Sequence, residues 1–231
     1  MIKKSEYYEL IASLPMLQGK LHSDFEHMSR ITFDKRLSKL KEDDLKMVTD
    51  LEDFIIWERN AMENAIDIEF KKKVLELQGK YKNKTFLDII EFSTQRRLMF
   101  GLLRKRKAGL EQAPPAEEFW LFPELRYNIE KFWDQPDFGL KHIGKNLAGF
   151  DKFIQEDEAL EMENQILQLT WDYCDRASYG HYFDIDFLLI YAIRRSIVER
   201  WNIAHTPQDI TEKFNTLAME AINGSTEEEN N

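Results

Sequence analysis

The sequence predicts an all-α protein, an elongated helical bundle with a long antiparallel helical hairpin. Two observations indicate this fold class. The chain of 231 residues contains only nine glycines and six prolines, so long segments lack the residues that interrupt helices. Apolar side chains also recur at intervals of three and four residues, a spacing that gathers them on one face of a helix, rather than at the interval of two typical of strands.

The first part of the chain is expected to form a short helix and then a long one. Thr32 can cap the short helix, which ends near residue 40. The long helix opens at Asp43 or Asp44, and no Gly or Pro follows before Gly79. We therefore expect one unbroken helix of more than 25 residues, about 50 Å long at 1.5 Å per residue.

The second arm of the predicted hairpin follows a short basic turn. It opens at Thr85 and ends at Gly109, because glycine suits the left-handed conformation beyond a helix C-terminus. The segment "QAPPAEEFWLFPELR" then breaks the helical pattern, which divides the chain into residues 1–111 and residues 112–223. The segment 224–231, which contains three glutamates, is predicted to form a disordered acidic tail.

The second half is expected to contain several further helices. They are predicted near residues 124–133, 137–146, 155–178, 186–201 and 206–222. The stretch "DFLLIYAIRRSIVERW" (186–201) is the most apolar of them. Its apolar residues cover an arc of about 160° on a helical wheel, with Leu188 and Leu189 on other sides, so this helix should be central and buried.

Arg194 lies inside that apolar arc and is predicted to be buried, although no carboxylate on its own helix can pair with it. Three explanations remain open. The guanidinium can extend outward past its apolar neighbours, it can meet an acidic side chain from another element, or it can contact another chain.

Composition excludes several functional classes. The net charge of -10 argues against a nucleic-acid-binding protein, because phosphate groups repel an acidic surface. A single cysteine and the lack of a signal-peptide pattern predict a cytoplasmic protein. The longest apolar run, Phe187–Ile193, is far too short to span a bilayer, so any membrane association would be peripheral.

Residues 71–107 form a basic island that carries 12 basic and only 3 acidic side chains. Solvation and the helix dipole can account for the cations in its last turn. The alternatives are a docking surface, for an acidic partner or for the other half of this chain, and a nucleic-acid site. The predicted partner-binding residues are Arg96, Arg97, Arg104, Lys105, Arg106 and Lys107.

Candidate catalytic chemistry is sparse. His181, Asp184 and Asp186 could hold a metal ion, but either aspartate is also well placed to cap the following helix. The segment "HSDFEH" (22–27) matches no metal-site spacing, and an acidic, aromatic surrounding should raise the pKa of Cys174. Because nucleotide-binding and hydrolase motifs are also absent, no catalytic residue, metal or cofactor is predicted, and the protein is expected not to be an enzyme.

Four stretches resemble a bacterial family without assigned activity whose members are encoded among V-type ATPase subunits. They are "YYELIASLP" (7–15), "DFIIWERNAMENAI" (53–66), "QRRLMFGLLRKRKAG" (95–109) and "HYFDIDFLLIYAIRRSIVERW" (181–201). That family is distantly similar to the C component of the V-type ATPase stalk, called d in eukaryotes. The chain departs from the pattern at Pro15-Met16, where the family has a double proline, and it is shorter than a full C component of the stalk.

The resemblance implies a non-enzymatic connector or accessory subunit that links the central stalk of the pump to its membrane rotor ring. Its partners would be other V-type ATPase subunits, and any peripheral association with the inner membrane would be through these partners. The alternative is a helical adaptor or regulatory module that binds an unrelated protein.

Overall fold

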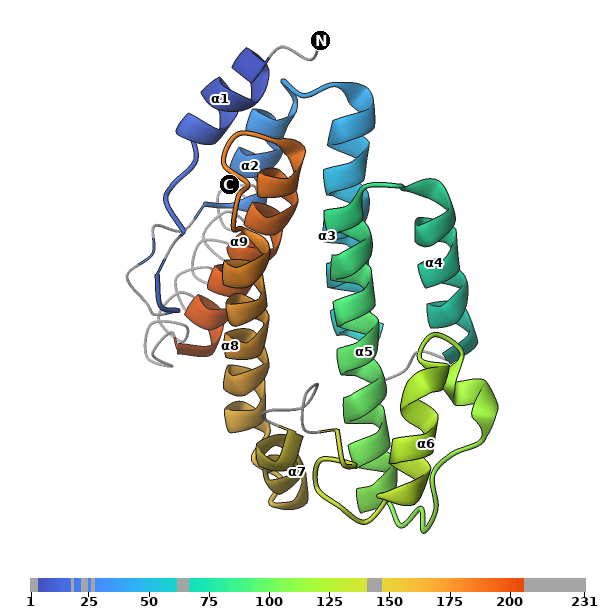
Figure 1. The fold of residues 1–231 in the computed structure, drawn as a ribbon. Helices are drawn as coiled ribbons and strands as arrows, with labels where there is room; N and C mark the ends of the chain where they lie inside the picture. Colours follow the sequence, from blue (N-terminus) through green and yellow to red (C-terminus); the bar gives the residue numbers. More distant parts are fainter. Residues whose placement is uncertain are drawn as a thin grey trace, which may run out of the picture.

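The computed structural model describes residues 4–17, 19–21, 25, 28–61, 67–140 and 147–205. All regular structure in these ranges is helical, which confirms the predicted all-α class (Figure 1). The predicted last helix and the acidic tail lie outside the described residues, as do residues 141–146 and most of residues 22–27.

Nine α-helices and one short 3-10 helix occur in the described part of the chain. They are α1 (Lys4–Ala12), α2 (Arg30–Leu37), α3 (Glu42–Ala61), α4 (Asp67–Lys80), α5 (Lys84–Lys107), η1 (Ala116–Phe119), α6 (Pro123–Lys131), α7 (Leu147–Gln155), α8 (Ala159–Ala177) and α9 (Ile185–His205). The long helices α3, α5, α8 and α9 run along the length of the molecule in Figure 1.

The prediction of one unbroken helix from residue 43 to residue 79 is wrong. The Tyr81 hydroxyl donates a hydrogen bond of 2.6 Å to the Asp50 carboxylate, and Lys80 forms an ion pair with the same group. In a single straight helix Asp50 and Tyr81 would lie about 45 Å apart. The chain instead folds back, so that α3 and α4 run in opposite directions (Figure 1).

The long antiparallel hairpin is therefore not confirmed. Its second arm exists as α5, with 24 residues, but only the 14 residues of α4 precede the turn. Packing explains the difference, because folding α4 back brings Phe70 within 6.1 Å of Phe54, measured between ring centroids, and buries both rings. Burial of large aromatic side chains outweighs the hydrogen bonds that a continuous helix would gain.

Two clusters of buried apolar side chains form the core of the part of the chain that the structure describes. The large cluster draws on α1 to α4, the start of α5, the end of α8, and α9. The small cluster draws on the end of α5, residues 119–140, α7 and the start of α8. Helices α5 and α8 thus contribute to both, and the predicted boundary at residue 112 does not coincide with the division between the clusters.

Helix α9 lies at the centre of the large cluster, as the apolar arc predicted. It packs against α3, α5 and α8, and every side chain from residue 188 to residue 198 is buried. Leu188 and Leu189 are fully buried although they lie outside the arc, because α9 has neighbours on several sides.

Two helices begin at a cap other than the predicted one. Ser29 caps α2 by accepting a hydrogen bond from the backbone N–H of Thr32, and Asn83 caps α5 in place of Thr85. Both caps are among the side chains preferred at that position. Gly109 follows the end of α5 with φ of +94°, as expected for its left-handed role.

Candidate functional site

Arg194 is buried, as predicted, and meets an acidic side chain from another helix. It is only 5% exposed, its Nη2 pairs with Asp175 of α8, and its guanidinium lies 5.5 Å from the ring centroid of Trp171. The carboxylate of Asp175 is 46% exposed. The charged end of Arg194 therefore reaches the edge of the core, where water also solvates its partner.

The neighbouring Arg195 forms a second ion pair, which the sequence pattern did not reveal. Its Nη2 lies 2.9 Å from Oε1 of Glu52 on α3, and both side chains are 3% exposed. Burial raises the pKa of Glu52 above its ordinary value of 4.5, and the positive charge of Arg195 opposes this. The pair joins α3 to α9 inside the large cluster.

Cations at the end of the basic island contact the other half of this chain. Lys105 pairs with Glu118, Arg106 pairs with Asp151 and donates to the carbonyls of Trp133 and Gln135, and Lys107 pairs with Asp157 and donates to the carbonyl of Ile154. One of the alternatives, docking of the island onto the second half of the chain, thus holds for these three residues. Their role in binding a separate partner stays a prediction.

The remaining three arginines of the prediction differ from one another. Arg96 donates to the Thr170 hydroxyl on α8 at 2.8 Å. Arg97 lies with its guanidinium 4.5 Å from the ring centroid of Phe70, and one of its nitrogens, Nη1, is shielded from solvent without a hydrogen-bond partner. Arg104 is exposed, and its side chain forms no hydrogen bond or ion pair with another described residue.

Arg97 and Arg104 line a pocket of about 560 Å³ between α4, one face of α5 and the segment after the proline pair. The wall from α5 consists of residues at helical spacing, namely Thr94, Arg97, Leu98, Gly101, Leu102, Arg104 and Lys105. Loss of hydration, and then the positive charge of Arg97, lower the pKa of Arg104. The two guanidiniums therefore repel each other in this pocket.

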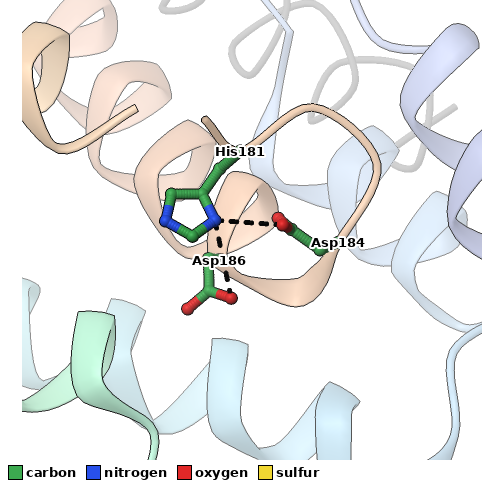
Figure 2. Close-up of side chains that lie close together, drawn as sticks. All are labelled: His181, Asp184 and Asp186. Atoms are coloured by element: carbon green, nitrogen blue, oxygen red, sulfur yellow. Dashed lines mark hydrogen bonds and ion pairs between the residues drawn. The ribbon is translucent and has the colours of Figure 1, made fainter. Parts of the chain in front are cut away.

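His181, Asp184 and Asp186 come together at the start of α9, and Figure 2 shows both carboxylates near the same ring nitrogen of the imidazole. Nδ1 of His181 lies 3.0 Å from Asp184 and 3.7 Å from Asp186. Asp184 also caps α9 by accepting from the backbone N–H of Phe187, and Asp186 accepts from the Asn83 amide. This donor set could hold a cation, but local hydrogen bonds already give each carboxylate a structural role.

We predict that chelation leaves the fold intact, because these side chains are satisfied by one another and by the ends of α5 and α9. The melting temperature should be the same within about 1 °C with and without excess EDTA, as a structural metal would contribute far more. Bound zinc or iron at a stoichiometric level, with a melting temperature that falls in EDTA, would contradict this prediction.

Cys174 does not have the properties of a nucleophile. Its side chain is fully buried, and this burial raises the pKa of the thiol to about 12. The thiol therefore stays protonated at neutral pH and packs as a small apolar group, as expected from its sequence environment.

A group of exposed aromatic side chains, here called the aromatic end, was not recognised in the sequence as a surface. It consists of Tyr8 on α1 with Tyr179, Tyr182 and Phe183 in the turn between α8 and α9, which are 57%, 88%, 63% and 46% exposed. The rings of Tyr8 and Phe183 lie 4.8 Å apart between centroids. The spacing "YGHYF" within one turn was the available signal.

No family model, curated protein or solved structure matches the chain. Among the described helices, none combines the length and the apolar character that crossing a membrane requires. The observations define an all-α protein with a buried charged centre, an aromatic end and one basic, partly apolar pocket in the part of the chain that the structure describes.

Proposed function

We propose that this protein is a non-enzymatic helical connector or accessory subunit of a bacterial V-type ATPase, joining the central stalk to the membrane rotor ring. The choice of V-type ATPase subunits as partners rests on the resemblance of four sequence stretches to a family encoded with that pump. The aromatic end is the observation that supports binding to a protein.

Exposed aromatic clusters are unusual on a surface that contacts only water. Tyr179 is 88% exposed, and the ring contact between Tyr8 and Phe183 ties the turn to α1. Aromatic side chains are enriched in protein interfaces because they bury a large area and lose little conformational entropy. Two separate segments of the chain thus present one apolar surface that a partner can cover.

The basic island has a smaller part in this proposal than the sequence suggested. Lys105, Arg106 and Lys107 hold the second half of the chain to α5. Reversal of these charges would break internal ion pairs. Weaker binding of such a variant could then result either from a lost interface or from a damaged fold. Variants in the aromatic end avoid this ambiguity.

The test is binding of the purified protein to purified stalk subunits and to the rotor ring of a bacterial V-type ATPase. The wild type should bind one of them, and the double variant Tyr179→Ala/Tyr182→Ala should bind at least tenfold more weakly, as each lost aromatic anchor costs about 1 kcal/mol or more. Titration calorimetry measures both affinities.

Tyr127→Ala is the matched control. Tyr127 is 68% exposed on α6, at the opposite end of the molecule from the turn between α8 and α9 in Figure 1, and its loss should leave binding unchanged. An equal loss in this control would contradict a role for the aromatic end. If the wild type binds neither component, the connector proposal fails, and the adaptor with an unrelated partner is favoured.

A further inference from the structure

The pocket on α5 has the dimensions and the apolar walls of a small-molecule site. Its volume of about 560 Å³ lies in the range of such sites. Phe70, Leu98, Leu102, Trp120 and Phe122 are among the residues that line it. An apolar body of moderate size can therefore leave water by entering this pocket.

The charge in the pocket is positive, although the whole protein carries a net charge of -10. Four cations line it against two carboxylates, and one of these carboxylates, Glu118, already pairs with Lys105. Arg97, Arg104 and Lys71 then face only Glu117, which is exposed. The guanidinium of Arg97 is partly buried against Phe70 and has no acidic partner in the described part of the chain, which is costly, and an anion would relieve that cost. Arg104 is exposed and adds a second positive charge at the same pocket.

The geometry of the arginines favours recognition of a planar anion. Arg97 and Arg104 lie seven residues apart on one face of α5, and the ring of Phe70 orients the guanidinium of Arg97. Its Nη1 is shielded from solvent and has no partner in the described part of the chain. Arginine donates two parallel hydrogen bonds to a carboxylate, which lysine cannot do.

A glycine in the middle of α5 gives the pocket its open floor. Gly101 costs about 1 kcal/mol of helix stability relative to alanine. A Cβ atom added at this position would have nothing within 4 Å, so close packing does not require the glycine. Its effect is to leave space between Leu98, Leu102 and Arg104.

We propose that this pocket binds an amphipathic carboxylate, a molecule with one carboxylate head and an apolar chain. The carboxylate pairs with Arg97 and Arg104, and the chain lies against Phe70 and Trp120. This site is separate from the aromatic end and does not depend on the proposed function.

Binding of three probes with the same chain tests the proposal: decanoate, decanol and decylamine, each below the concentration at which it forms micelles. Calorimetry should show decanoate binding at least tenfold more tightly than decanol, because only the anion pairs with the arginines. Decylamine should not bind, because three cations repel it. Comparable binding of decanol and decanoate would overturn the role of the arginines.

Two variants separate the head from the chain. Arg97→Met/Arg104→Met should weaken decanoate binding at least tenfold and leave decanol unchanged. Gly101→Leu should abolish binding of both probes by filling the floor, without a lower melting temperature, because leucine favours the helix. Undiminished decanoate binding in Gly101→Leu would overturn the proposal even if the double arginine variant failed to fold.

Gly79→Leu is the matched control. Gly79 is also helical with nothing within 4 Å of an added Cβ, but it lies in α4 outside the pocket. It should bind decanoate as the wild type does. Decyl phosphate tests the alternative head group, a phosphate. Tight binding of decyl phosphate without binding of decanoate would overturn the assignment of a carboxylate.

Discussion

Arg195→Ala is expected to lower the free energy of unfolding by about 3 to 5 kcal/mol, because it leaves the buried carboxylate of Glu52 without its partner. The two side chains are each 3% exposed, so water cannot take the place of the guanidinium. Urea denaturation monitored by circular dichroism measures the change.

Arg194→Ala is the matched control, one position earlier on the same helix. Its partner Asp175 is 46% exposed and stays solvated after the change, so the loss should be no more than about 2 kcal/mol. The double variant Glu52→Leu/Arg195→Met replaces the pair with apolar side chains and should be close to the wild type in stability. Equal losses for Arg194→Ala and Arg195→Ala would contradict the buried pair.

Trp171→Ala should lower the free energy of unfolding by about 3 to 5 kcal/mol through the cavity that it leaves. The ring is fully buried in the large cluster, beneath Arg194, and its Nε1 donates to the carbonyl of Gly19 at 2.7 Å. The indole therefore ties the segment after α1 to α8. The same denaturation experiment measures the effect.

Trp171→Phe separates the cavity from the hydrogen bond. It keeps most of the apolar volume and removes the donor to Gly19, so a smaller loss of about 1 to 3 kcal/mol is expected. If Trp171→Ala cost less than about 1 kcal/mol, the indole would not be the anchor between these segments.

The fold class could be predicted from the sequence, but the path of the chain could not. The scarcity of Gly and Pro specified helices, and the apolar arc of residues 186–201 specified a buried one. The reversal between α3 and α4 has no such signal, because the intervening segment "MENAI" contains no helix breaker. The rings of Phe54 and Phe70 meet only after the chain has folded back, and periodicity along one segment cannot show that.

For the charged sites, too, one feature could be predicted from the sequence and another could not. The wheel placed Arg194 among apolar neighbours and so predicted its burial. It gave no prediction for Arg195, whose partner Glu52 is 143 residues away in the sequence. The pocket likewise needs three separate segments to form. Local patterns indicate which side chain is buried, whereas only the tertiary fold determines which acidic side chain pairs with it.

Helices α5 and α8 each supply side chains to both clusters. A helix transmits the loss of a turn to the next turn, since each residue shares hydrogen bonds with residues four positions away. The two clusters are therefore coupled through these two shared helices. We infer that the chain unfolds cooperatively as one unit and that a fragment ending at residue 111 would lack a complete core.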